Sequence, residues 1–137
     1  MKKKVQEKKL ILFNVGGTYF QTSRSTLTRA TPNCSPLHRI SSNSTNINFD
    51  RDEKGAYWID RDPAYFQVLL NYMRHGHLLL NNQLVEEGVL LEAEYFNIPQ
   101  LVNLIQQRIN NRALNAFLGP QSQEWLSQCV NKNLLDV

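Results

Sequence analysis

The chain has 137 residues, 42% of them hydrophobic, which suffices for one modest core and excludes wholesale disorder. Its longest uninterrupted apolar run covers residues 10–13, whereas a membrane span needs about 20 apolar residues, so no membrane association is expected. Five lysines in residues 1–9 account for the net charge of +3, because ten basic residues face eleven acidic ones from residue 10 onward. That balance argues against the clustered basic surface of a nucleic-acid binder.

Residues 1–9 and the two cysteines indicate the cellular compartment. Residues 1–9 are predicted to be a flexible basic leader, and they lack the apolar stretch of a secretory signal. Cys34 and Cys129 are the two cysteines of the chain, too few for a disulfide framework. They suit a reducing compartment, so we expect the protein in the cytoplasm or the nucleus.

A β-hairpin is predicted at the start of the folded part. Residues 10–15 are an apolar run with β-branched members, and residues 18–22 alternate around two aromatic side chains. Gly16 and Gly17 stand between them, where a hairpin turn needs residues that tolerate positive φ. Residues 56–60 are expected to add another strand.

Two short helices are predicted after the hairpin. The first ends at residue 29 and is capped by Ser23 or Ser25, whose hydroxyl groups can accept from free backbone N–H groups. The second covers residues 36–40, because Ser35 suits a helix N-cap and is followed by proline.

A longer helix begins after Asp62, which is a suitable N-cap, with Pro63 in the first helical position. Gly76 supplies a C-terminal stop. Between them, apolar side chains recur at helical spacing and predict one buried face. These side chains are Phe66, Leu69, Leu70 and Met73.

The second half of the folded part is predicted to be mostly helical. Residues 78–80 are too short for a helix and predict a strand, and residues 84–96 predict a helix that is interrupted or bent near Gly88. Asn97 is expected to cap the next helix, which starts near Pro99.

The last segment, residues 113–137, predicts a short C-terminal helical tail. Residues 113–118 can extend the preceding helix, and Gly119 with Pro120 breaks it. Residues 122–130 predict one more amphipathic helix, with Trp125 on its apolar side.

The sequence contains no pattern typical of catalysis. There is no G-x-S-x-G motif, P-loop or dinucleotide fingerprint, so we expect neither an enzyme nor a bound cofactor. Cys34, His38, His75 and His77 are the metal-ligand candidates, but their spacing does not make a closed zinc site, and no metal is expected.

The densest polar cluster is Asp60-Arg61-Asp62. An acid–base dyad is the least favoured interpretation, because Asp62 already serves as a helix cap. Two others remain open: a solvated corner, or part of a polar subunit interface in which charges set register and partner choice.

Three blocks of sequence follow one another in order: residues 13–20 with 22–27, residues 60–63 with Phe66 and residues 70–76, and residues 86–90 with 92–98. Together they resemble the potassium-channel-tetramerisation type of BTB/POZ domain, and the resemblance spans residues 10–112. The sequence at residues 55–57 and 86–89 is most similar to the soluble KCTD branch that serves cullin-3 ubiquitin ligases.

The resemblance implies an α/β (α+β) fold, the BTB/POZ fold, with a small sheet flanked by short helices. It implies a homo-oligomeric ring, a homo-tetramer or homo-pentamer, that docks cullin-3 and presents an unknown substrate protein without doing chemistry itself. The alternative is a ligase-independent oligomerisation or regulatory module acting on a channel or signalling protein.

Site residues follow from the same resemblance. For the oligomer interface they are Asp60, Arg61, Asp62 and Arg74. For cullin docking they are Leu37, His38, Arg39, Tyr95 and Phe96. The structural turns and caps are Gly16, Gly17, Pro63, Gly76 and Asn97.

The chain also departs from the pattern. Pro36 stands where relatives carry a bulky aromatic, Leu91 where an acid is usual, and Trp58 where a smaller apolar residue is usual. Residues 113–137 are shorter than the substrate domain of longer members. Pro36 and Leu91 therefore bear directly on whether the cullin contact is kept.

Overall fold

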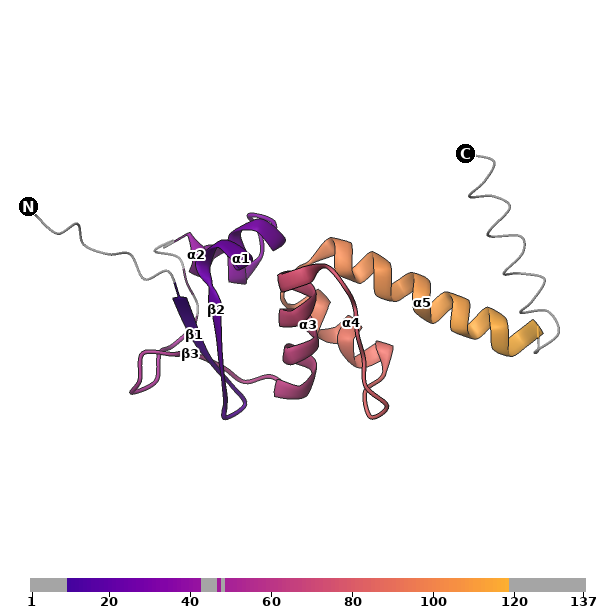
Figure 1. Cartoon of the computed structure of the whole chain (residues 1–137), viewed down its shortest axis with the longest axis horizontal. Coiled ribbons are helices and arrows are strands. Elements are labelled where there is room, and N and C mark those ends of the chain that lie inside the picture. The colour runs from indigo at the N-terminus through magenta and orange to yellow at the C-terminus, as the bar shows by residue number, and fades with distance from the viewer. Residues whose placement is uncertain (1–9, 43–46, 48, 119–137) are drawn as a thin grey trace, which may run out of the picture.

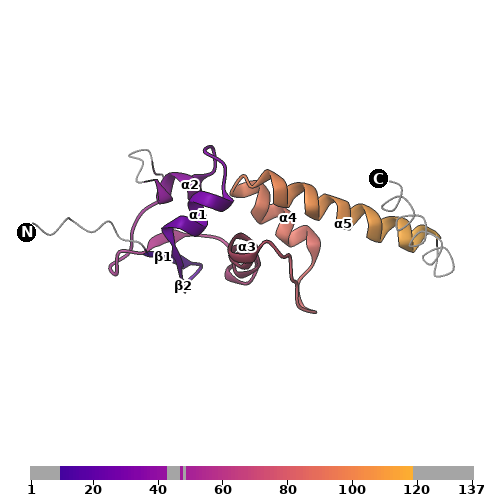
Figure 2. The same ribbon diagram turned by 45° about the horizontal axis from the view of Figure 1, so that its top comes forward.

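The computed structural model describes residues 10–42, 47 and 49–118. A small sheet and two short helices lie at one end of the molecule, a central helix follows, and two further helices lie beyond it (Figures 1 and 2). The expected leader, residues 1–9, and the predicted helix at residues 122–130 fall outside the described residues.

The sheet has three strands in the order β2-β1-β3. Strand β1 (Leu10–Val15) pairs antiparallel with β2 (Thr18–Ser23) and parallel with β3 (Tyr57–Ile59). Gly16 and Gly17 form the hairpin turn with φ of +56° and +96°, values that glycine adopts without steric cost. The predicted hairpin and third strand are confirmed.

Five helices complete the described part of the chain, and together with the sheet they confirm the α/β class. The longest, α5, leaves the body of the molecule and extends past α4 (Figure 1). The helices are α1 (Arg24–Ala30), α2 (Pro36–Ser41), α3 (Pro63–His75), α4 (Glu86–Tyr95) and α5 (Pro99–Leu118).

The helix starts follow the capping residues of the sequence. The side chains of Ser23, Ser35 and Asp62 accept from backbone N–H groups in the first turns of α1, α2 and α3. Gly76 ends α3 in the left-handed region, with φ of +78°. These local predictions are confirmed, and Ser23 rather than Ser25 caps the first helix.

Phe66 on α3 is the centre of the core. Its ring lies edge-on to Phe13 of β1 at 5.5 Å, to Phe20 of β2 at 5.1 Å and to Phe96 after α4 at 5.5 Å between ring centroids. Edge-to-face pairs of this kind add to the burial of the rings themselves. One aromatic side chain therefore joins the sheet, the central helix and the helical end.

The strand predicted at residues 78–80 is wrong. This segment is irregular, and Leu78 is buried in the core. No strand of the described residues lies beside it to supply a hydrogen-bond ladder, so its apolar side chains pack without forming sheet.

The predicted interruption of the helix at Gly88 does not occur. Helix α4 is continuous from residue 86 to residue 95. A Cβ atom on Gly88 would lie 2.2 Å from Cζ of Tyr65, so the glycine provides space for the close approach of α3. The Tyr65 hydroxyl accepts from the Val85 backbone N–H at 3.2 Å and fixes the start of α4.

Asn97 is a cap, but of the helix before it. It has φ of +55°, its N–H donates to the carbonyl of Glu94, and the Ile98 N–H donates to the carbonyl of Ala93. This pair of bonds is the Schellman arrangement that ends α4. The prediction that Asn97 starts α5 is corrected, because its left-handed backbone places it outside that helix.

Helix α5 runs without a break across residue 112, the expected end of the domain, to Leu118. Its first half presents Leu101 and Ile105 to the core. No helix among the described residues combines the length and the hydropathy that a membrane span requires.

Candidate functional site

The junction between β3 and α3 carries the Asp60-Arg61-Asp62 cluster, and the hairpin turn packs against it. The Gly16 N–H donates to the Ile59 carbonyl at 2.9 Å. A Cβ atom on Gly16 would lie 2.6 Å from the Arg61 carbonyl oxygen. Gly16 is therefore required both by its positive φ and by this close approach, and it positions the charged junction.

Arg61 is held within its own chain. Its Nε and one terminal nitrogen donate to the two carboxylate oxygens of Glu92, each at 3.0 Å, and its guanidinium lies 4.1 Å from the centroid of the Tyr95 ring. The Glu92 side chain is 8% exposed and that of Arg61 is 28% exposed. This bidentate pair fixes α4 to the start of α3. Arg61, which was predicted to contact a neighbouring subunit, is therefore already paired within its own chain.

The other three predicted interface residues lie on the surface. Asp62 caps α3 through Oδ1, Asp60 is exposed, and Arg74 near the far end of α3 donates to the Gln21 carbonyl at 2.7 Å. Asp62 and Arg74 are about 18 Å apart along the helix at 1.5 Å per residue. The structure thus places an acidic patch and a basic group at opposite ends of one helix rather than in one cluster.

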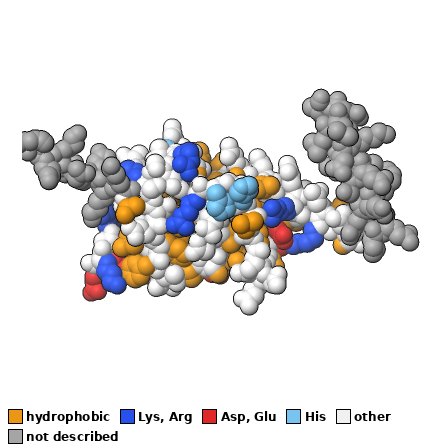
Figure 3. Space-filling model, in the orientation of Figure 1, with side chains coloured by type: hydrophobic (Ala, Val, Ile, Leu, Met, Phe, Trp, Pro, Cys, Tyr) orange, Lys and Arg blue, Asp and Glu red, His pale blue; other side chains and the backbone are white. Residues whose placement is uncertain are grey.

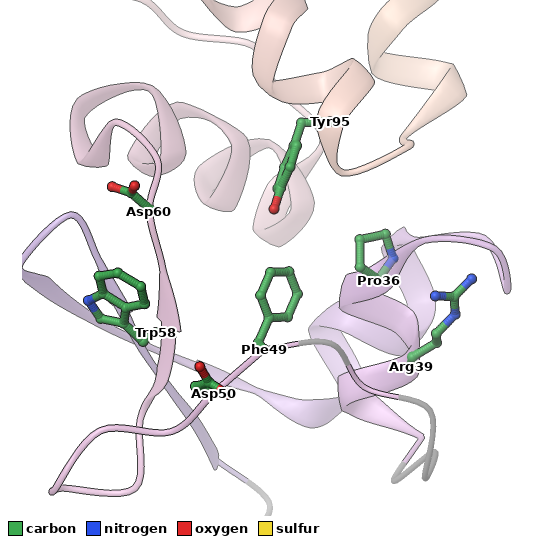
Figure 4. Close-up of a pocket in the computed structure, with 7 residues that line it drawn as sticks. All are labelled: Pro36, Arg39, Phe49, Asp50, Trp58, Asp60 and Tyr95. Atoms are coloured by element: carbon green, nitrogen blue, oxygen red, sulfur yellow. The ribbon is translucent and has the colours of Figure 1, made fainter.

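A groove of about 390 Å³ lies between α2, β3 and α4. Figure 4 shows Tyr95 and Phe49 pointing toward the same space, with Pro36 beside them. Trp58 and Tyr95 are large and exposed, at 47% and 43%. The residues that line the groove are Pro36, Arg39, Phe49, Asp50, Trp58, Asp60 and Tyr95.

Only two of the five residues predicted for cullin docking line the groove. Arg39 and Tyr95 line it, and His38 is half-buried with Nδ1 3.0 Å from the Thr31 carbonyl. Leu37 and Phe96 are fully buried in the core, so the prediction that they contact a partner is wrong. Each is the direct neighbour of a groove residue, and one residue along a helix turns the side chain by about 100°.

Phe49 and Asp50 are groove residues that sequence reasoning did not single out. Phe49 is an aromatic residue at the end of a polar stretch rich in serine, threonine and asparagine. A lone aromatic in such a stretch is the signal that could have identified it.

A second polar network lies beside the hairpin turn. Asp52 accepts from the Tyr19 hydroxyl at 2.5 Å and from Asn14 Nδ2 at 3.1 Å. The hydrogen bond from Tyr19 is the largest cause that lowers the pKa of Asp52 to about 2, and the same bond raises the pKa of Tyr19. The network ties the charged turn before β3 to the first two strands.

The histidines and acids do not gather into a metal site in the described part of the chain. No group of three or more His, Cys, Asp or Glu side chains there is arranged to hold an ion. His75 and His77 lie side by side at the exposed end of α3, with ring centroids 5.4 Å apart. Figure 3 shows histidine side chains at the surface of the face that it draws, near Lys and Arg side chains.

Residues 11–105 match the family model of the BTB/POZ domain. The chain belongs to the BTB/POZ domain family. It is 50% identical to BTB/POZ domain-containing protein KCTD5 of Homo sapiens over 127 residues, which are 92% of this chain and 53% of that protein. It is 47% identical to KCTD17 of Homo sapiens over 92% of this chain and 40% of that protein. The resemblance to KCTD-type BTB domains is confirmed.

BTB domains of this family are oligomerisation and adaptor modules and are typically not enzymes. The chain spans about half the length of the KCTD5 proteins that it matches.

Proposed function

We propose that this BTB domain closes into a homo-tetrameric or homo-pentameric ring, docks a cullin-3 ubiquitin ligase and presents a substrate protein for ubiquitination. The observation that carries the proposal is the placement of unlike surfaces on one subunit. Acidic Asp60 and Asp62 lie at one end of α3, and Arg74 lies at the other. A ring needs two different, complementary patches on each subunit, because its interfaces are heterologous.

The basic end of α3 is reinforced by a second arginine. Arg29 of α1 donates to the carbonyls of Met73 and Arg74 at 3.3 and 3.5 Å, which places its guanidinium beside the end of the helix. Charges of opposite sign on two meeting surfaces set register and reject wrong pairings. We therefore assign Asp60 and Asp62 of one subunit to the basic end of α3 in the next.

Apart from Asp60, which we assign to the ring interface, the residues that line the groove form the surface that we assign to cullin-3. It is open and lined by both aromatic and charged side chains, and it places exposed Trp58 and Tyr95 on its walls. Exposed Trp and Tyr beside a hollow are the residues that dominate many protein interfaces. A ring that carries one groove per subunit raises the local concentration of ligase and substrate, and that effect needs no catalytic group.

The native mass of the chain tests the ring. We expect a mass of four or five subunits at physiological salt, and Asp60→Lys should lower it because a lysine would face the arginines of the neighbour. Glu53→Lys makes the same change of charge on the exposed turn before β3 and should leave the mass unchanged. A full-sized ring with Asp60→Lys would contradict the interface assignment.

The same measurement with an N-terminal fragment of cullin-3 tests the docking groove. We expect about one fragment per subunit, and Trp58→Ala should weaken binding while the ring persists. Leu79→Ala removes an exposed apolar side chain from the irregular segment after α3 and serves as the control.

A ring that ignores the fragment would favour the alternative function, a ligase-independent module that acts on a channel or signalling protein. Pro36 is the observation behind that alternative, because it forms part of the groove wall where relatives carry an aromatic residue. Replacing Pro36 with Phe would then show whether this departure alone removes the contact.

A further inference from the structure

A pocket of about 520 Å³ lies where α1, the C-terminal end of α3 and the start of α5 meet. We call it the basic pocket, and the side chains in it that can donate from nitrogen are Arg29, Arg74, His75 and Gln100. A smaller hollow of about 310 Å³ shares Arg29 and Gln100 with it. The described residues that line these two spaces include no Asp or Glu. The site therefore has the size of a small-molecule pocket and a positive charge.

The two arginines of the basic pocket keep charges that no acid neutralises. Arg29 donates to the carbonyls of Met73 and Arg74 at 3.3 and 3.5 Å. Arg74 donates to the side-chain oxygen of Asn71 at 3.3 Å and to the Gln21 carbonyl at 2.7 Å. These acceptors are all neutral, and neither arginine takes part in an ion pair within the part of the chain that the structure describes. A guanidinium has five N–H donors, so each arginine retains donors for a ligand.

His75 adds another donor on the same face of the molecule (Figure 3). Its Nδ1 accepts from the His77 backbone N–H at 3.2 Å, so the proton of the neutral ring is on Nε2. The Gln100 amide supplies two further N–H groups. Guanidinium, imidazole and amide donors together match the several acceptor oxygens of a phosphate group, and guanidinium groups can bind phosphate in a bidentate manner.

We infer that the basic pocket binds a small soluble molecule that carries two phosphate groups, and that this ligand competes with ring closure. Two guanidinium groups from different helices suit two phosphate groups, and the space is larger than one phosphate needs. The competition rests on the proposed ring, in which Asp60 and Asp62 of one subunit face the same arginines of the next. Binding to the pocket does not depend on the ring.

The competition gives the ring a means of regulation. A ligand shifts an equilibrium when it binds one of the two states more tightly. In the closed ring the neighbouring carboxylates would occupy the arginines, whereas in the separated subunit the arginines are open to solvent. A phosphate ligand would therefore favour separated subunits, and the ring would weaken its binding by the same factor.

Isothermal titration calorimetry with inorganic pyrophosphate tests the pocket. Asp60→Lys is the starting variant, because it should lack the ring and leave the pocket open. We expect saturable binding that is about tenfold tighter than in the unaltered chain, where the neighbouring subunit must first be displaced. Glu53→Lys makes the same change of charge on an exposed turn and should bind like the unaltered chain. The absence of saturable binding to Asp60→Lys would overturn the inference.

Removing single donors from the Asp60→Lys variant locates the ligand. Arg29→Gln should weaken pyrophosphate binding about tenfold, because hydrogen bonds between charged groups are lost. Gln100→Ala should weaken it less, and this residue lies outside the assigned ring interface. Arg108→Gln removes an exposed arginine of α5 that does not line the pocket, so it is the matched control. Equal losses from Arg29→Gln and Arg108→Gln would overturn the site.

Vesicles separate the two sources of a phosphate group. We expect Asp60→Lys to ignore phosphatidylcholine vesicles that contain phosphatidic acid. Binding to these vesicles that Arg29→Gln abolishes, without binding of pyrophosphate, would overturn the soluble ligand in favour of a lipid headgroup.

The native mass of the unaltered chain tests the competition. Pyrophosphate should lower it further than sodium chloride of equal ionic strength, because charge screening is the same in both solutions. An unchanged ring together with calorimetric binding would overturn the competition. A chain that is monomeric without pyrophosphate would contradict the proposed ring instead, and the Arg29→Gln comparison would then decide the pocket by itself. The two proposals therefore fail separately.

Discussion

Two arginine–glutamate contacts hold α4, one near each end of the helix, and they differ in their surroundings. Near its C-terminal end, Glu92 is almost fully buried and accepts hydrogen bonds from two nitrogens of Arg61. The Arg61 guanidinium also packs against the Tyr95 ring. At its N-terminal end, half-buried Glu86 and exposed Glu87 accept from exposed Arg112 of α5. The chemical groups are the same, but only the first contact contains a buried carboxylate.

This difference predicts unequal effects on stability. A buried ion pair leaves an uncompensated charge when one partner is removed, whereas exposed pairs are weakened by water and salt. The Arg61–Glu92 pair should therefore determine how firmly the corner that bears Asp60 and Tyr95 is held. The Arg112 pairs should matter mainly for the position of the outer half of α5.

The largest expected effect is that of Glu92→Ala. It leaves the Arg61 guanidinium largely shielded and unpaired, and we expect a loss of about 3 kcal/mol in the free energy of unfolding. Urea denaturation at one fixed protein concentration measures it, because assembly contributes to apparent stability. Glu94→Ala removes an exposed acid from the same helix and should change little. Equal losses from the two variants would contradict the contrast.

Gly88 lies on α4 between the two contacts, and Gly88→Ala should lower the free energy of unfolding by about 2 kcal/mol. The added methyl group would overlap the Tyr65 ring, and overpacking of this kind is destabilising. Thermal denaturation at fixed protein concentration is the measurement. In a Tyr65→Ala background the same change should become stabilising, since alanine has about 1 kcal/mol better helix propensity than glycine. A loss in both backgrounds would mean that the overlap with Tyr65 is not the cause.

Asp52 extends the comparison to a partly exposed carboxylate held by several hydrogen bonds. Its pKa is lowered to about 2, so its contribution to stability is complete above the ordinary pKa of 3.8 and is lost as the pH falls from there toward 2. Tyr19→Phe removes the strongest of these bonds and should raise the pKa of Asp52. A carboxyl titration by NMR would show it, and an unchanged Asp52 would exclude the Tyr19 bond as the main cause.

The smallest effect should come from Arg112→Ala. The hydrogen bond from Arg112 lowers the pKa of Glu87, yet Arg112 and Glu87 are exposed, so the unfolding midpoint should move little and less still at high salt. Arg108→Ala, on an exposed neighbour, is the control. A shift as large as that of Glu92→Ala would remove the distinction between the two ends of α4.

The features that were predicted correctly depend on neighbours in the chain. The hairpin follows from two glycines between alternating strands, and α3 begins after Asp62-Pro63 and ends at Gly76. Capping and turn conformations act over three or four residues, so a single sequence is enough to find them. The KCTD-type resemblance likewise rests on ordered local blocks, and the family match agrees with it.

The errors concern contacts between distant residues. Leu37 and Phe96 were expected on a docking surface beside Arg39 and Tyr95, but the packing around Phe66 draws Phe96 inward. Gly88 was interpreted as an interruption or a bend of the helix. Its actual role, to make room for the Tyr65 ring, could not be seen because Tyr65 lies 23 residues earlier in the chain. Sequence spacing does not reveal which side of a short helix faces the core when polar and apolar residues alternate on both sides.

The sequence by itself determined where the strands and helices of this BTB domain begin and end, with the exceptions at residues 78–80 and Asn97, because those limits are set by local backbone preference. Only the tertiary structure decided which neighbours of a buried residue reach the surface. It assigned Arg61 to Glu92 across 31 residues, opened the groove between α2, β3 and α4, and left Trp58 and Tyr95 exposed beside that groove. These outcomes depend on how elements distant in sequence pack together, and burial and pairing of charges are properties of that packing alone.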